Sequence, residues 1–144
     1  MPEAERTIVI DRPAAQAFAF FSDPGNDPKW RPAVKEISAQ PPTGVGSTIH
    51  QTVKGPGGRG IPSDFEVMAY EPSSRYSFKV TAGPVWPVGE FRFAPSGSGT
   101  EVTLSLSAEL SGIKKLLLAK PVQTSMNSEV AAALDKAKAL IEST

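Results

Sequence analysis

The sequence predicts an α+β domain in which a curved antiparallel sheet is covered on one face by a long C-terminal helix. Residues 47–109 contain strand-like segments separated by short turns, and strands joined by such short connections pair antiparallel. In the last of these segments apolar and polar residues alternate, so that one face of the sheet is buried and the other is solvated. From Ile113 to Glu142 the apolar spacing changes to three or four residues, which is the period of a helix.

The N-terminal part is predicted to form one strand and two short helices. Residues 6–11 (RTIVID) make a short apolar run, and Pro13 then opens a helix-forming segment, because proline is tolerated in the first turn. Turn residues at 23–28 end this helix, and residues 29–32 are expected to add one more short helical turn. A second strand is expected at 34–38.

A third strand, at 47–54, leads into the loop KGPGGRG, whose glycines have the G-x-G-x-x-G spacing of dinucleotide-binding loops. Such a loop holds a pyrophosphate only where a helix follows it, because the helix N-terminus supplies the amide hydrogens. The residues that follow, IPSDFEVMAY, alternate as a strand does. The loop is therefore predicted to be a hairpin whose glycines adopt positive φ, and no nucleotide site is expected.

The remaining chain is predicted to form four more strands and one long helix. The strands are expected at 61–70, 75–81, 86–94 and 100–109, with turns at 71–74, 83–84 and 95–99. The helix is expected over 113–142, and Pro121 should kink or begin it, because proline in a helix interior removes a hydrogen bond and clashes with the preceding turn. Since no repeat or linker interrupts this order, residues 1–144 are expected to be a single domain.

Composition excludes several kinds of function. The 15 basic and 15 acidic residues give no net charge, so a nucleic acid partner is not expected. The absence of cysteine excludes disulfides, thiolate nucleophiles and sulfur-ligated zinc, and one histidine is too few for a histidine-rich metal site, so no metal or other cofactor is expected. The chain shows no signal-peptide pattern and no apolar run long enough to span a membrane, which predicts a cytoplasmic protein. The oligomeric state is left open.

Several stretches, together with the order of the elements, resemble the START-like superfamily (SRPBCC, polyketide cyclase/dehydrase and lipid transport proteins). These stretches are IVIDRPAAQAFAFFSDPGNDPKW, GVGSTIHQTVKG, FEVMAYEPSSRYSFKV and FRFAPSGSGTEVTLSLSAEL, within a resemblance that covers about residues 5 to 142. The resemblance implies a helix-grip fold, in which a seven-stranded sheet wraps around the long helix and leaves an apolar cavity. It does not fix the function, because the superfamily includes carriers, hormone receptors, cyclases and chaperone activators.

The alternation of the strands and the period of the helix select candidate cavity-lining residues. Most are apolar or aromatic, as a hydrophobic ligand requires. Gln51 is the polar exception within a strand, and Trp30 and Trp86 lie at element ends near the expected rim, where rim packing is the alternative to a role in binding. The candidates are Trp30, Ile49, Gln51, Val53, Phe65, Val67, Tyr76, Phe78, Val80, Trp86, Phe91, Phe93, Leu104, Met126, Val130 and Ala133.

No catalytic residue is assigned. His50 is the one side chain whose ordinary pKa suits acid–base chemistry at neutral pH, but the strand period places it on the face opposite Gln51, toward solvent. The first hypothesis is therefore a carrier or sensor of a hydrophobic small molecule such as a lipid, isoprenoid, polyketide or aromatic compound. The alternatives are a cyclase or dehydratase in which Gln51 and Tyr76 move protons, and a protein-interaction domain of the chaperone-activator or toxin–antitoxin type.

Overall fold

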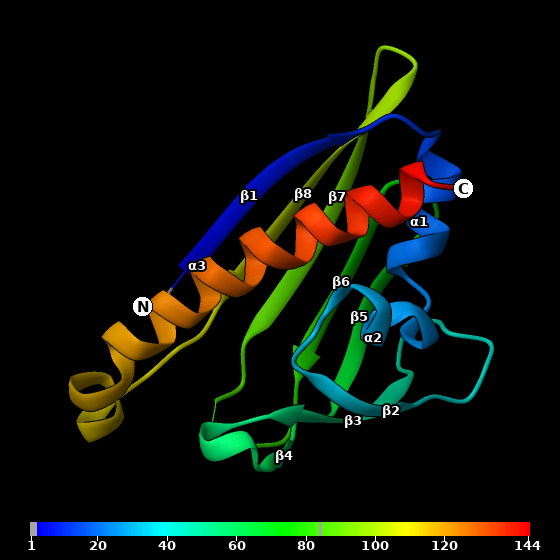
Figure 1. The fold of residues 1–144 in the computed structure, drawn as a ribbon. Helices are drawn as coiled ribbons and strands as arrows, with labels where there is room; N and C mark the ends of the chain where they lie inside the picture. The colour runs from blue at the N-terminus through cyan, green and yellow to red at the C-terminus, as the bar shows by residue number, and fades with distance from the viewer. Residues whose placement is uncertain (1–2, 84) are drawn as a thin grey trace.

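The N-terminal segment forms one strand and two short helices, as predicted (Figure 1). In the computed structural model, residues 3–83 and 85–144 are described. Pro13 precedes the first helix with an extended backbone, and the Asp23 side chain caps the next turn by accepting a hydrogen bond of 3.0 Å from the Gly25 backbone N–H. The elements are β1 (Glu3–Ile10), α1 (Ala14–Phe21), the 3-10 turn η1 (Pro24–Asn26) and α2 (Asp27–Trp30).

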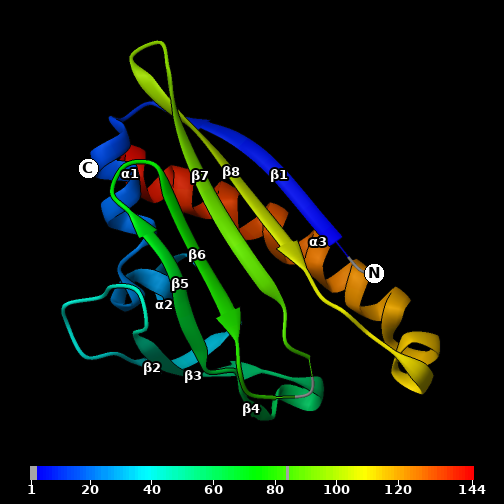
Figure 2. The same ribbon diagram turned by 180° about the vertical axis from the view of Figure 1, so that it is seen from behind.

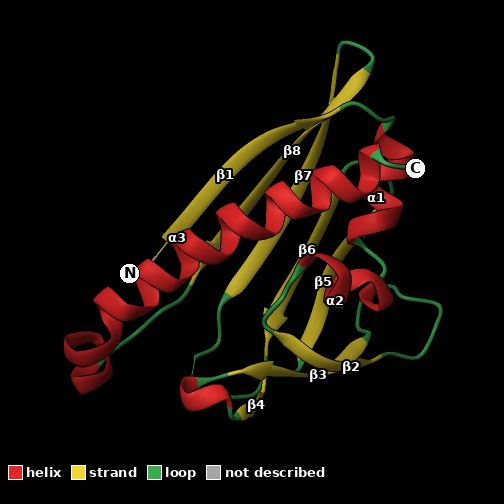
Figure 3. Ribbon diagram, viewed as in Figure 1, coloured by secondary structure: helices red, strands yellow, loops and turns green. Residues whose placement is uncertain are grey.

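The strands form one curved antiparallel sheet. Seven of them lie in the order β1-β8-β7-β6-β5-β3-β2, and the short strand β4 pairs with β3 beside this path. The predicted helix-grip arrangement of a seven-stranded sheet and a long helix is thereby confirmed (Figure 3). The strands are β2 (Val34–Ser38), β3 (Thr48–Lys54), β4 (Gly60–Pro62), β5 (Phe65–Glu71), β6 (Arg75–Val80), β7 (Val88–Ser96) and β8 (Gly99–Ser107).

Several predicted boundaries are shifted by a few residues in the structure, and three of the differences concern the course of an element. The strand expected at 61–70 is divided into β4 and β5, because Asp64 turns out of the ladder and binds β3 with its side chain. The strand expected at 86–94 begins only at Val88, so Trp86 lies in the preceding loop. Helix α3 (Gly112–Glu142) continues through Pro121, so this proline does not begin it. Pro84, in the predicted break at 83–84, lies outside the described residues.

The glycine-rich loop is a hairpin, as expected. A single 3-10 turn, η2 (Pro56–Gly58), connects β3 to β4, and Thr52, Val53 and Lys54 pair with Pro62, Ile61 and Gly60. Gly57 and Gly58 have φ of 71° and 78°, a conformation that costs glycine nothing. Because a strand and not a helix follows the loop, the structural context of a dinucleotide-binding motif is absent at this loop.

Helix α3 lies across the concave face of the sheet, and Figure 2 shows the opposite face of the sheet turned away from it. Its backbone is close to those of β1 and α2, whereas the central strands lie farther away. Polar side chains of α3 bind the outer edge of β1: Gln123 exchanges hydrogen bonds with the Glu3 backbone, and Lys138 donates to the Val9 carbonyl at 2.6 Å. Within the described residues, no helix has the length and apolar character needed to cross a lipid bilayer.

Aromatic rings fill the end of the sheet next to α1. Phe18 packs edge-to-face on Tyr70 and Phe93, with ring centroids 5.2 and 5.4 Å apart, and Phe21 stacks on Phe91 at 4.9 Å. Such pairs add to the hydrophobic stabilisation that burial of the rings provides. The end of the sheet next to α1 is therefore closely packed.

Candidate ligand-binding site

A cavity of about 370 Å³ lies between α3 and the sheet. It exists because the backbone of α3 stands away from the central strands and small side chains face the gap. Ala133 supplies a small side chain on the helix side. On β7, Gly89 leaves room for the ring of Phe78, which a Cβ atom at position 89 would meet. The cavity wall is built mainly by apolar residues of β3, β5, β6, β7, β8 and α3. Ile61 and Pro62 of β4 and the loop residues Ser63, Ala82, Val85 and Pro87 lie at its side.

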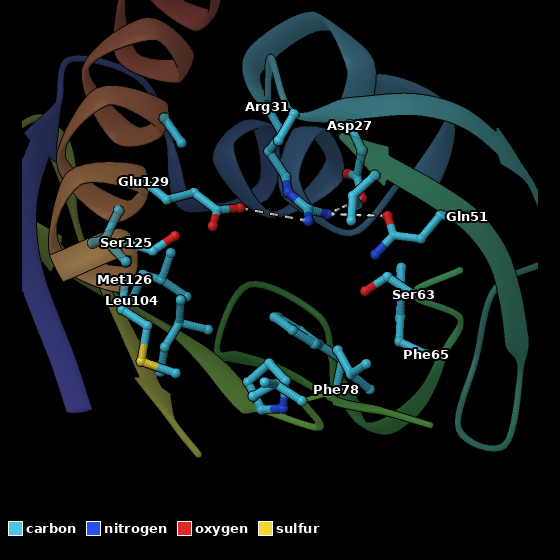
Figure 4. Close-up of a pocket in the computed structure, with 18 of the residues that line it drawn as sticks. Asp27, Arg31, Gln51, Ser63, Phe65, Phe78, Leu104, Ser125, Met126 and Glu129 are labelled. Atoms are coloured by element: carbon cyan, nitrogen blue, oxygen red, sulfur yellow. Dashed lines mark hydrogen bonds and ion pairs between the residues drawn. The ribbon is translucent and has the colours of Figure 1, made fainter. Parts of the chain in front are cut away.

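Asp27 and Arg31 bring opposite charges to one end of this cavity. They are four residues apart across α2, a spacing that places both side chains on the same side of a helical turn. Arg31 Nη1 lies 3.3 Å from Asp27 Oδ2 and donates to Gln51 Oε1, also at 3.3 Å. Figure 4 shows these groups forming a chain from α2 to β3 above the apolar wall.

Glu129 extends this chain to α3. Its Oε1 lies 3.9 Å from Arg31 Nη2, so the guanidinium of Arg31 lies between two carboxylates (Figure 4). The side chain of Glu129 is 41% exposed, whereas those of Arg31 and Asp27 are 19% and 8% exposed. The ion pair with Asp27 is thus mostly shielded from water, and the one with Glu129 is at the cavity's open side.

Burial raises the pKa of Asp27 from its ordinary value of 3.8 to about 6. Removal of water disfavours the carboxylate, and the opposing attraction of Arg31 compensates only part of this cost. The indole N–H of Trp30 also lowers the pKa of Asp27, although it has no partner in hydrogen-bond geometry among the described residues. Asp27 is therefore a buried acid whose titration falls close to neutral pH.

Tyr76 adds a neutral phenol to the cavity wall. Burial raises the pKa of its hydroxyl above the ordinary value of 10, and the negative charge of Asp27 acts in the same direction. Tyr76 remains protonated at every physiological pH as a result. It can donate or accept a hydrogen bond but does not act as a base.

Gln51 is held in the cavity by bonds to both its backbone and its side chain. Asp64 Oδ1 accepts the Gln51 backbone N–H at 3.1 Å, and the Gln51 side-chain oxygen accepts from Arg31. With the oxygen fixed in this way, the amide nitrogen points into the cavity toward Ser63 (Figure 4). The other oxygen of Asp64 lies 2.9 Å from His50 Nδ1, on the solvent side of the strand.

Comparison with known proteins places this architecture in a family. A family model described as polyketide cyclase / dehydrase and lipid transport matches residues 1–142, which is nearly the whole chain. The chain belongs to this polyketide cyclase/dehydrase and lipid transport family. The START-like resemblance seen in the sequence is thereby confirmed, whereas no curated protein matches the chain.

Solved structures with the same fold are similar to this chain. In some the similarity covers nearly the whole of the other protein, and in one it covers about half of a di-domain protein. TTHA0849 from Thermus thermophilus has a TM-score of 0.81 at 22% identity, with 97% of both chains covered. Ara h 8.0201 has a TM-score of 0.77 at 15% identity, with 99% of this chain and 98% of that chain covered. The di-domain ARO/CYC StfQ from the steffimycin biosynthetic pathway has a TM-score of 0.83 at 14% identity, with 99% of this chain but 51% of that chain covered.

Most of the predicted cavity residues of this family member line the cavity. These are Trp30, Gln51, Val53, Phe65, Tyr76, Phe78, Val80, Phe91, Leu104, Met126, Val130 and Ala133.

Four predicted residues do not lie in the cavity wall. Phe93 packs against α1, and Ile49 and Val67 are completely buried in the core. Strand alternation identifies which side chains face inward, but it does not show where along the strand the helices pack against them. Trp86 is 52% exposed, and its indole N–H donates to the Gly83 carbonyl in its own loop.

Sequence reasoning missed the charged groups of the cavity. Asp27 and Arg31 lie in a short helical turn among prolines, and this segment is too short for a helical period to be recognised in the sequence. Their spacing of four residues was the available signal. Glu129 lies three residues after Met126 and four before Ala133, so the same period that predicted those two as inward also places Glu129 beside them.

Proposed function

We propose that this protein binds a hydrophobic or amphipathic small molecule in the cavity between α3 and the sheet, as a carrier or sensor. The observation that carries the proposal is an internal space of about 370 Å³ with a mostly apolar and aromatic wall and a few convergent polar groups at one end. Cavities of this size and composition are typical of small-molecule sites. The family description, which includes lipid transport, supports the same function class.

The candidate ligands are a lipid, an isoprenoid, a polyketide or an aromatic compound. All of them have an extended apolar part, and burial of this part in the cavity would favour binding by about 25 cal/mol for each Å² removed from water. All can also place an oxygen beside the polar end of the cavity. The wall residues Phe65, Phe78 and Phe91 would contact the apolar part, and Gln51 the oxygen.

Two measurements test the binding function. Organic-solvent extraction of the purified protein, followed by mass spectrometry, should release a hydrophobic compound that an equal extraction of heat-precipitated and washed protein does not. The neutral dye N-phenyl-1-naphthylamine should bind the extracted protein saturably, with one dye per chain and increased fluorescence. Absence of a co-purified compound together with absence of saturable dye binding would exclude a carrier or sensor of this kind.

A cyclase or dehydratase is the second candidate, and one observation favours it. Asp27 lines the cavity as a buried acid with a pKa of about 6, and an acid or base is most effective when its pKa is near the working pH. Arg31, beside it, could stabilise negative charge on a ligand oxygen. In D₂O, such an enzyme should accelerate loss of the methyl proton signal of 2-acetylnaphthalene, and Asp27→Asn should abolish the acceleration. Equal exchange rates with and without protein would count against it.

A further inference from the structure

The positive and negative charges that line the cavity do not balance at its polar end. Two carboxylates, Asp27 and Glu129, and two cations, Arg31 and Lys54, belong to the wall. Lys54 is exposed at the end of β3, where water screens its charge. Among the described residues, only Arg31 presents a positive charge within the polar end, and there it faces both carboxylates.

The guanidinium of Arg31 is already committed to partners in the protein. Nη1 serves Asp27 and Gln51, each at 3.3 Å, and Nη2 lies 3.9 Å from Glu129 (Figure 4). A ligand carboxylate within reach of Arg31 would therefore stand next to one or both protein carboxylates. Like charges repel strongly where little water separates them, and the site would carry one positive charge against three negative ones.

The neutral groups of the polar end suit a different ligand chemistry. The Gln51 amide nitrogen points into the cavity and is a hydrogen-bond donor, and Ser63, Ser125 and the Tyr76 phenol are uncharged groups that also line the wall. A hydroxyl or carbonyl oxygen can bond to such groups without adding charge. An unpaired polar group in an apolar wall is costly, so a ligand that pairs with these groups is favoured over a pure hydrocarbon.

We propose that the cavity selects a neutral, oxygen-bearing apolar molecule, such as an alcohol or a ketone, and discriminates against carboxylates because Asp27 and Glu129 mask Arg31. This inference rests on the binding function proposed above and narrows its ligand class. Arg31 acts as a positioning residue: it holds the oxygen of Gln51 so that the amide nitrogen faces the ligand.

Dodecan-1-ol and dodecanoate provide a matched test, because the two probes share a chain of the same number of carbon atoms and differ in the charge of the head group. Each is titrated against the protein with bound N-phenyl-1-naphthylamine at pH 7.5, and the ratio of dodecanoate affinity to dodecan-1-ol affinity is measured. The wild type should favour dodecan-1-ol. Asp27→Asn and Glu129→Gln, tested separately, should each raise the ratio by about tenfold, because each removes one of the repelling charges.

Glu101→Gln is the control variant, because it removes the same charge from an exposed position on β8 that is not part of the cavity wall. Its ratio should equal that of the wild type. Glu129 is partly exposed, so Glu129→Gln tests the inference without a change in the buried part of the cavity wall. A wild type that prefers dodecanoate, or ratios unchanged in both cavity variants, would overturn the inference and leave the binding function intact. Failure of both probes to displace the bound dye would argue against the binding function itself.

Discussion

Asp27 contributes both to the charge of the cavity and to the pH dependence of stability. It is buried on α2 and lies beside Arg31, yet its pKa is raised to about 6, so burial outweighs the ion pair. The native state therefore binds the Asp27 proton more tightly than the unfolded state does. The contribution of Asp27 to the free energy of unfolding falls as the pH rises from about 4 to about 6, and it stays low above that window.

Asp27→Asn should consequently stabilise the fold at pH 7.5. Asparagine is uncharged at every pH, so the variant avoids the cost of a buried carboxylate, which amounts to up to about 3 kcal/mol for a shift of this size. Urea unfolding of the wild type and the variant at pH 4, 5, 6 and 7.5 measures the difference. The gain should shrink as the pH falls toward 4, and a gain that is independent of pH would show that the pKa of Asp27 is not raised.

His50→Ala should leave ligand binding within threefold of the wild type. The His50 side chain is 69% exposed and bonds to Asp64 on the solvent side of the strand, whereas Gln51 faces the cavity. Exposed substitutions of this kind usually change stability by less than about 0.5 kcal/mol. Dye titration and thermal unfolding of the variant check both expectations, and a tenfold loss of affinity would contradict them.

The orientation of single residues was predictable where they belong to a strand or helix long enough to show a regular pattern. Gln51 and Tyr76 follow from strand alternation, because successive side chains point to opposite faces over several residues. Asp27 and Arg31 could not be placed in this way, since α2 has only four residues and its orientation depends on how it packs against α3 and β2. The polar end of the cavity is thus a product of tertiary contacts.

At the scale of elements, α3 determines where the interior is filled and where it is empty. Its inward positions Ala133 and Ala137 are both buried, but only Ala133 lines the cavity. The same residue type one helical turn apart therefore faces open space in one case and packed core in the other. This contrast supplies a matched pair of variants.

Ala133→Phe should fill the cavity without loss of stability and should abolish binding of N-phenyl-1-naphthylamine. Ala137→Phe should instead overpack the core, at a cost of about 1 to 3 kcal/mol, and retain dye binding in the folded fraction. Melting temperature and dye fluorescence, measured together on both variants, decide between these outcomes. A large drop in melting temperature for Ala133→Phe with dye binding retained would place the empty space elsewhere along α3.

At the scale of the whole molecule, the architecture was predictable and the cavity's shape was not. Short connections dictate antiparallel neighbours, and the change from alternation to helical spacing after Glu109 marks the single long helix. The division of the predicted strand at Asp64 was not predicted, because a hydrogen bond between a carboxylate and a neighbouring strand does not alter the alternation of apolar and polar residues. The distance between α3 and the central strands depends on many side chains at once. Alternation alone therefore could not show that Ile49 and Val67 belong to the core and not to the cavity wall.

The hydrogen bonds from α3 to β1 have a consequence for self-association. An open sheet has two edges, and unpaired backbone groups on an edge strand can recruit a strand from another chain. On β1 these groups are occupied at the Glu3 backbone by Gln123 and at the Val9 carbonyl by Lys138.

Lys138→Leu should therefore aggregate faster than Lys136→Leu, which adds the same apolar side chain at an exposed position of the same helix. Light scattering and thioflavin T fluorescence during incubation below the melting temperature measure the difference. Equal aggregation of the two variants would show that the edge is protected by other means. If Lys138→Leu does aggregate faster, the helix that closes the cavity is also the element that keeps each molecule from serving as a template for the next.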